Sequence, residues 1–184
     1  SGRRLMDTLN GVLNLSKLQA GEMELAPAPI DLAAEARDTV DQFSPQAEEA
    51  DVDVALAVQS TVQAWADEGG LRIILRNLLS NAIKYTEAGG RVVVRVRSEE
   101  GWAVLEVEDT GIGMDPEAAD QFFEAFKQAS EGIGREYEGT GLGLTVTQEA
   151  VGQMDGEIEV ETERGGGSCF VVRLPKESPG GARP

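Results

Sequence analysis

The chain has 184 residues, of which 41% are hydrophobic, and it carries a formal net charge of −17 at pH 7. This composition is sufficient for one domain with an apolar core, and the acidic balance excludes a broad basic surface for nucleic acid and argues against contact with an anionic membrane. Because the chain contains no histidine, Ser-His-Asp catalysis, histidine-bound metals and a phosphohistidine within this chain are also excluded.

The first segment of the chain is predicted to be a helix, at residues 3–19. Leu5 and Leu9 begin an apolar stripe at helical spacing, and a glycine follows the segment as a stop. Isolated helices of this length are marginal in water, so we interpret residues 1–21 as half of a helical hairpin or dimer; a helix docked on its own domain is the alternative. Residues 22–30 are predicted to be a linker or an edge strand.

A second helix and two strands follow this segment. Asp31 is a good N-cap for a helix at residues 32–50, with Pro45 as a candidate break. Residues 52–58 alternate as a strand does, with larger apolar residues at every second position, and residues 62–66 are predicted to form a second, shorter strand.

The middle of the chain combines a buried helix with a β-hairpin. Asp67 caps a helix that runs to about Tyr85. Residues 91–98 and 102–108 alternate around a turn, which predicts an antiparallel hairpin whose second strand ends at Asp109. The apolar residues of the helix, which we expect to be buried, are Leu71, Ile74, Leu75, Leu78, Leu79 and Ile83.

The C-terminal part begins with a glycine-rich stretch at residues 110–140. It contains a short apolar helix near Phe123, and residues 129–139 lack periodicity and are predicted to form a mobile lid. The remaining predicted elements are a helix at 141–154, strands at 156–163 and 168–174, and a disordered tail at 176–184.

The order of these elements predicts the fold class. Strands come in pairs, with helices between the pairs, and there is no run of strand–helix–strand units. We therefore predict an α/β (α+β) two-layer sandwich over residues 31–175, in which a mixed, mostly antiparallel sheet carries helices on one face and a helix precedes the domain.

The single cysteine and the lack of targeting signals indicate a compartment. Cys169 cannot form an internal disulfide, which fits a reducing environment, and we expect a buried core residue rather than a reactive thiol. The sequence has no apolar run of about 18 residues and no signal peptide, so we expect a cytoplasmic chain whose parent can still be membrane-anchored.

Three segments together predict a nucleotide pocket. Asp109 ends a strand and precedes Gly-x-Gly, which leaves backbone with no side chain in the way. Asn77, Asn81 and Lys84 fall on one face of a helix. The run Gly139-Thr-Gly-Leu-Gly-Leu144 opens a helix, where free N–H groups and the helix dipole attract phosphate.

Other nucleotide motifs are excluded by the same residues. A P-loop needs Gly-Lys followed by Ser or Thr, and no Gly-Lys pair occurs in the chain. A Rossmann turn needs a third glycine at the position that Leu144 occupies. Eukaryotic-type kinases need His-Arg-Asp, which a chain without histidine cannot supply.

Taken together, the chain resembles the GHKL ATPases, the superfamily of gyrase, heat-shock, histidine-kinase and mismatch-repair ATPases. The resemblance runs from about Leu5 to Pro175 and implies the Bergerat fold. Its motifs, in order, are an N box at Asn77-x-x-x-Asn81-Ala-x-Lys84-Tyr85, a G1 box at Asp109-x-Gly111-x-Gly113, an F box at Phe123-x-x-Phe126 and a G2 box at Gly139-Thr-Gly-Leu-Gly-Leu144.

The resemblance implies a site for ATP and Mg²⁺. Asn81 would hold Mg²⁺ through its side-chain oxygen, Asp109 would accept a hydrogen bond from the adenine amino group, and Tyr85 would stack on the base. Lys84 would reach the phosphates. The other implied contacts with the nucleotide are those of Asn77, Gly111, Ile112, Gly113, Gly139, Thr140, Gly141, Leu142, Gly143 and Leu144, with Gln128 and Arg135 closing over the γ-phosphate from the lid. The glycines of the G1 box would leave space for the base.

The residue at position 77 discriminates within the superfamily. Hydrolytic members carry a glutamate there as the general base for water, whereas Asn77 cannot take a proton. The chain is thus similar to sensor histidine kinases, and Leu13 to Gly21 resembles the end of the second helix of their dimerisation and phosphoacceptor domain.

This resemblance implies a catalytic domain that transfers the ATP γ-phosphoryl group to a histidine outside this chain and onward to a response regulator, in a homodimeric parent. The expected partners are therefore ATP, a phosphoacceptor histidine domain and a receiver domain. A hydrolytic GHKL ATPase clamp and a degenerate nucleotide-sensing module are the alternatives.

Overall fold

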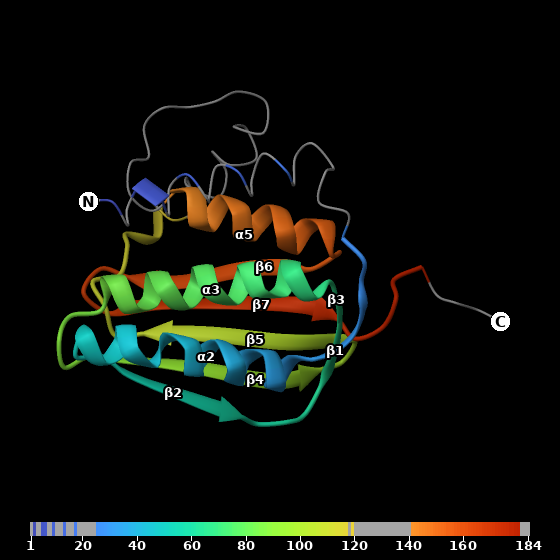
Figure 1. The fold of residues 1–184 in the computed structure, drawn as a ribbon, viewed down its shortest axis with the longest axis horizontal. Coiled ribbons are helices and arrows are strands. Elements are labelled where there is room, and N and C mark those ends of the chain that lie inside the picture. The colour runs from blue at the N-terminus through green and yellow to red at the C-terminus, as the bar shows by residue number, and fades with distance from the viewer. Residues whose placement is uncertain are drawn as a thin grey trace.

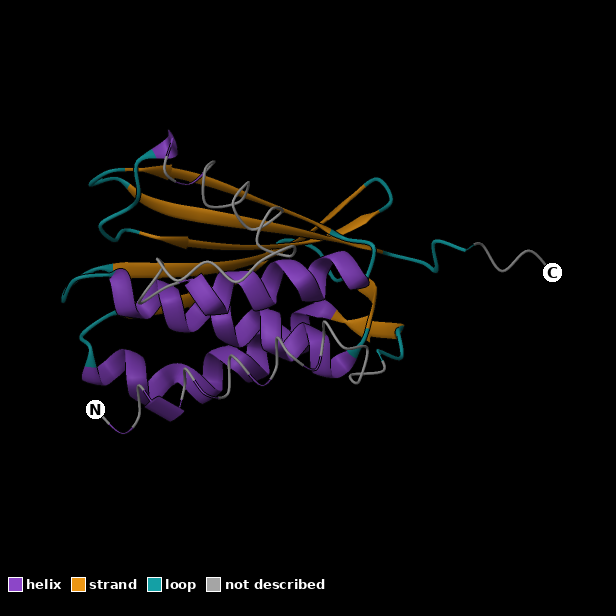
Figure 2. Cartoon of the chain, turned by 90° about the horizontal axis from the view of Figure 1, so that it is seen from above, coloured by secondary structure: helices purple, strands orange, loops and turns teal. Residues whose placement is uncertain are grey.

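The computed structural model describes residues 2, 5, 6, 9, 13, 17, 25–117, 119 and 141–180. They form two layers, with strands on one side and helices on the other, as Figures 1 and 2 show. The elements are β1 (Ala28–Asp31), α2 (Leu32–Glu49), β2 (Asp53–Val58), β3 (Gln63–Ala66), α3 (Glu68–Tyr85), β4 (Arg91–Glu99), β5 (Trp102–Asp109), α5 (Gly141–Gln153), β6 (Glu157–Glu163) and β7 (Gly167–Pro175).

The main sheet has five strands in the order β2-β4-β5-β7-β6, and only β2 runs parallel to its neighbour. This confirms the predicted mixed, mostly antiparallel sheet and the β4–β5 hairpin. β2 and β3 follow one another in the sequence but do not pair with each other. β2 joins β4 through a crossover that includes α3, as a parallel pair requires, and β3 pairs instead with β1 in a separate two-stranded sheet.

Aspartate caps begin the first two described helices of the domain. The Asp31 carboxylate accepts the Ala34 N–H at 3.1 Å, and the Asp67 carboxylate accepts the Gly70 N–H at 2.7 Å. α2 continues through Pro45 without the break that the sequence suggested. The turn around Pro45 is exposed, so water can reach the carbonyl that loses its N–H partner there.

The core lies between the sheet and α3, which is the central helix of the layer. The six α3 side chains predicted to be buried are each at most 2% exposed. They pack with the apolar, helix-facing side chains of β4, β5 and β7. Burial of a leucine or isoleucine contributes roughly 1.5–3 kcal/mol each, so this helix is held firmly against the strands.

α3 and α5 lie side by side and antiparallel. The backbone N–H of Asp67 contacts the sulfur of Met154 at 3.3 Å, and the Asn77 amide reaches the Thr147 hydroxyl at 3.5 Å. The start of α3 therefore lies near the end of α5, and the end of α3 lies near the start of α5. The N-terminus of α5 at Gly141 thus lies beside the last turn of α3, as Figure 1 shows.

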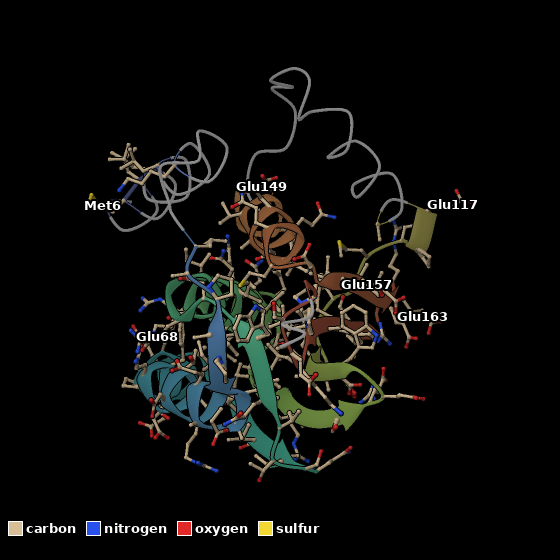
Figure 3. The ribbon with its side chains drawn as sticks, turned by 90° about the vertical axis from the view of Figure 1, so that its right-hand side faces the viewer. Met6, Glu68, Glu117, Glu149, Glu157 and Glu163 are labelled. Atoms are coloured by element: carbon tan, nitrogen blue, oxygen red, sulfur yellow. The ribbon has the colours of Figure 1, made fainter. Side chains whose placement is uncertain are left out.

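The helix-free face of the sheet carries an ion-pair network. Arg97 pairs with Glu106 at 2.8 Å, and Arg173 pairs with Glu159 at 2.9 Å. Val104, which lies between these arginines in the strand register, is 0% exposed. The arginine stems therefore cover apolar surface on this side, and part of the acidic surface is paired rather than only solvated. At the edge of the sheet, Glu157 and Glu163 of β6 are exposed to solvent (Figure 3).

Cys169 lies on this same face of the sheet, outside the apolar core, where Glu108 and Glu161 are its cross-strand neighbours. The expectation of a core position is therefore wrong. Burial, assisted by the neighbouring glutamates, raises the pKa of the thiol to about 11.

We expect Cys169 to react with iodoacetamide at pH 8 about two orders of magnitude more slowly than an ordinary thiol, because only the thiolate is nucleophilic. The rate should climb as the pH approaches 11 and should become ordinary when urea unfolds the chain, which mass spectrometry can follow. A rate in the folded protein equal to that in urea would contradict the assignment.

The described positions before residue 25 are all helical, in agreement with the predicted first helix. Their apolar side chains are exposed, from Leu13 at 47% to Leu5 at 71%, and Figure 3 shows Met6 apart from the sheet. The role of this helix in a dimer stays a prediction. Among the described residues, no helix has both the length and the apolar character needed to cross a membrane.

Candidate nucleotide-binding site

Asp109, the last residue of β5, is a buried carboxylate at the C-terminal end of the central strand of the sheet. It is 7% exposed, and its Oδ1 accepts the Gly111 N–H at 2.9 Å. Burial raises the pKa of the carboxyl, and the backbone N–H groups of Gly111 and Ser168 oppose that rise. A ligand that donates a hydrogen bond to this oxygen pair would therefore stabilise the charged form.

The loop that follows Asp109 is bonded to the end of α3. The N–H of Ile112 donates to the Tyr85 carbonyl at 3.2 Å. A Cβ atom on Gly111 would lie 2.3 Å from the same carbonyl oxygen, so only glycine permits this approach. The G1 box and the N box are thus in direct contact, and Ile112 itself is exposed beside them.

The same loop is bonded on its other side to the turn between β6 and β7. The Gly165 N–H donates to the Ile112 carbonyl at 2.7 Å, and the Met114 N–H donates to the Thr162 hydroxyl at 2.8 Å. Gly113 has φ +63°, and a Cβ atom there would lie 1.9 Å from the Glu163 carbonyl oxygen. Close packing against the Tyr85 and Glu163 carbonyl oxygens therefore explains why both positions of the G1 box are glycine. Their role in leaving space for a base stays a prediction.

The polar face of α3 lies beside this loop. The Asn77 amide donates to Thr147 of α5, as a long hydrogen bond, so the residue faces the neighbouring helix. Asn81 is half-buried on the same face. The Lys84 ammonium lies 5.3 Å from the centre of the Tyr85 ring. The Lys84 side chain thus lies against one face of the Tyr85 ring, and stacking of Tyr85 on adenine stays a prediction.

The N-terminus of α5 completes the arrangement. Gly141, Leu142 and Gly143 belong to its first turn, whose N–H groups have no partner inside the helix and carry the positive end of the helix dipole. Leu144 is buried in the core, where it supports this turn by packing. Gln128, Arg135, Gly139 and Thr140, together with the F box, lie outside the described residues.

The predicted site did not include Thr162, Ser168 and Thr147, although the structure brings them to it. Thr162 and Ser168 are polar residues at positions of β6 and β7 that face the apolar core side of the sheet, close to the turn that joins the two strands. A polar residue on the core-facing side of a strand could have been detected in the sequence as a candidate for a structural or site role, because its burial requires a hydrogen-bond partner.

The fold and this arrangement define a Bergerat-type ATP-binding domain. The chain belongs to the family described as "Histidine kinase-, DNA gyrase B-, and HSP90-like ATPase", whose family model matches residues 66–178. This confirms the resemblance inferred from the motifs.

Among curated relatives, the chain is similar to the circadian input-output histidine kinase CikA of Synechococcus elongatus, with 38% identity over 97% of this chain and 24% of the relative. It is also similar to the autoinducer 2 sensor kinase/phosphatase LuxQ of Vibrio parahaemolyticus, with 35% identity over 95% of this chain and 21% of the relative. The chain therefore spans about a quarter or less of the length of these relatives.

Solved structures agree with the fold. Full-length ShkA in complex with AMPPNP has a TM-score of 0.79 and 37% identity, over 95% of this chain and 36% of that chain. The histidine kinase AdeS of Acinetobacter baumannii has a TM-score of 0.75 at 20% identity, over 96% of this chain and 80% of that chain. The second likeness supports the fold alone.

Proposed function

We propose that this chain is the ATP-binding catalytic part of a two-component sensor histidine kinase. The parent protein would transfer the γ-phosphoryl group of Mg-ATP to a histidine on a phosphoacceptor domain, and then to an aspartate on a response regulator, in a cytoplasmic part of a homodimer. The support is the family membership, together with the similarity to named histidine kinases over almost the whole of this chain.

The residues present fit an adenine nucleotide. The buried Asp109 carboxylate lies at the end of β5, directly before a loop that α3 and the β6–β7 turn both hold, so it is preorganised to accept a hydrogen bond from an exocyclic amino group. A guanine presents a carbonyl oxygen at that place, which a carboxylate would repel. The exposed Ile112 side chain supplies apolar contact area next to it.

The phosphate end would lie where the first turn of α5 meets the last turn of α3. The N–H groups of that first turn would donate to phosphate oxygens, and Lys84 would add a positive charge from α3. Asn81 would hold Mg²⁺, which takes oxygen ligands and shares its shell with phosphate and water. When bound, the ion would neutralise charge that develops on the transferred group.

The observation that carries the choice of a kinase is Asn77. Its side chain faces Thr147 across the α3–α5 contact. Hydrolytic members of the superfamily carry a glutamate at this position, which acts as the general base for water. An amide cannot accept a proton from water. The γ-phosphoryl group would therefore wait for another nucleophile, and catalysis would consist of positioning and charge neutralisation.

The test supplies this chain with labelled ATP, Mg²⁺ and a purified phosphoacceptor domain. We expect label on the histidine of that domain, slow release of phosphate without it, and a loss of roughly 10- to 100-fold in Asn81→Ala, as is typical when support of a metal site is removed. Asn81→Asp, which keeps an oxygen ligand, should retain more of the activity. Rapid phosphate release by the chain alone would instead indicate a hydrolytic clamp, and absence of nucleotide binding would indicate a degenerate module.

A further inference from the structure

Three polar side chains form a row across neighbouring strands at the end of the sheet. Thr162 of β6 is the register partner of Ser168 of β7, and Ser168 is the register partner of Asp109 of β5. Register partners in an antiparallel sheet point to the same face. Asp109 and Ser168 are buried and Thr162 is half-buried, so the row runs along the helix-covered face and ends at the adenine-binding carboxylate.

The Thr162 hydroxyl is fully used at its end of this row. It accepts the Met114 N–H at 2.8 Å, lies 2.8 Å from the Ser168 hydroxyl, and lies 3.2 Å from the Gly167 carbonyl. A hydroxyl group has one donor and two acceptor sites. One consistent assignment has Thr162 donating to Gly167 and accepting from both Met114 and Ser168.

This hydroxyl joins two segments that are far apart in the sequence. Met114 belongs to the loop after Asp109, whereas Gly167 is the first residue of β7, directly after the turn between β6 and β7. The neighbouring Gly165–Ile112 hydrogen bond ties the same two segments through backbone alone. Thr162 therefore supplies the side-chain contact that fixes the C-terminal end of the loop, while the Tyr85 carbonyl fixes its middle.

We propose that Thr162 is a positioning residue for adenine recognition: its hydroxyl locks the 109–114 loop onto the β6–β7 turn and so holds Asp109 and Ile112 in the geometry that receives the base. This inference rests on the proposed function, because it assigns the residue to the ATP site. Thr162 does not itself reach the base; it acts through the loop, and removing its hydroxyl leaves the Met114 N–H without its acceptor.

The test compares three variants of the whole chain. Thr162→Val removes the hydroxyl while keeping the shape, and Thr162→Ser keeps the hydroxyl. Thr39→Val is the matched control, because Thr39 is a buried threonine on α2 whose hydroxyl donates to the Glu35 carbonyl at 2.9 Å, outside the loop contacts. Calorimetry measures ADP binding, and amide hydrogen exchange measures protection of residues 110–116 in the free protein.

We expect Thr162→Val to raise hydrogen exchange in the loop and to weaken ADP binding about tenfold, because ADP must then order a loop that has lost about one hydrogen bond of support. Thr162→Ser should restore both properties to within about twofold, and Thr39→Val should change neither. In the phosphotransfer assay the loss should appear in KM for ATP, with kcat nearly unchanged.

Two results would overturn this inference alone: ADP binding by Thr162→Val at the affinity of the unaltered chain, or equal weakening in Thr162→Val and Thr162→Ser. If the unaltered chain binds no ADP, the proposed function fails first and the inference fails with it. The two failures are therefore told apart by the unaltered chain.

Discussion

The Asp109→Asn variant is expected to bind ADP about 10- to 100-fold more weakly than the unaltered chain, while its free form stays at least as stable. The loss follows because a charge-assisted hydrogen bond contributes about 1.5–3 kcal/mol and asparagine carries no charge. Stability is kept because burial disfavours the charged carboxylate, and the Asn side-chain oxygen can still accept the Gly111 N–H.

The stability difference between Asp109→Asn and the unaltered chain is expected to change with pH in a defined direction. The pKa of Asp109 in the folded chain is raised above its ordinary value of 3.8. The neutral form therefore stabilises the fold below the ordinary pKa, and that stabilisation is lost as the pH rises through the folded pKa. Because asparagine does not titrate, the stability of Asp109→Asn relative to the unaltered chain should grow through this window and then stay constant.

Calorimetry for ADP and thermal unfolding at several pH values measure both effects. Asp115→Asn is the control, since Asp115 is exposed just after the same loop and its carboxylate accepts the nearby Glu117 N–H at 3.0 Å. It should retain both affinity and stability. Tight ADP binding by Asp109→Asn would remove the basis for adenine recognition, and a large drop in its stability would contradict the burial argument.

The Gly113→Ala variant is expected to lose roughly 2–4 kcal/mol of unfolding free energy, from a strained backbone together with an overlap that must be relieved. The residue has φ +63°, and its added Cβ would lie 1.9 Å from the Glu163 carbonyl oxygen. Relief would push the loop away from the β6–β7 turn, so ADP affinity should fall as well.

Gly89→Ala separates the two causes. Gly89 has φ +86°, and a Cβ atom there has nothing within 4 Å, so this variant should lose only about 1 kcal/mol, from backbone strain alone. Urea unfolding of both variants, followed by circular dichroism, provides the comparison. Equal destabilisation of the two would show that the contact with Glu163 has no energetic weight.

Local signals in the sequence predicted most elements of this fold. The helical period of the α3 leucines and isoleucines, the Asp31 and Asp67 caps and the Glu100-Gly101 turn each act over a few residues, and the structure contains all of them. The sequence did not reveal the parallel β2–β4 pair or the β1–β3 pair, because strand pairing over long separations depends on which faces meet in the folded chain.

The residues of the candidate site also fall into those that local sequence motifs predicted and those that depend on long-range contacts. Asp109 and Asn77 were chosen from motif spacing, and the structure brings their segments together. The Cys169 error arose because the expectation rested on the usual burial of free cysteines, which does not show on which face of the sheet the residue lies. The close approaches at Gly111 and Gly113, and the Lys84 ammonium over Tyr85, depend on contacts that only the folded backbone defines.

The interior place of β7 in the sheet has a consequence for biosynthesis. On the ribosome, β5 emerges long before β7 and must wait with one edge unpaired, a state prone to misassembly. The backbone N–H of Ser168, which supports Asp109, lies in β7, and the Thr162 hydroxyl, which anchors the loop, lies in β6. Both strands are synthesised last among the strands of the sheet. A nascent chain should therefore acquire nucleotide affinity abruptly, once residue 175 has emerged, rather than gradually during translation.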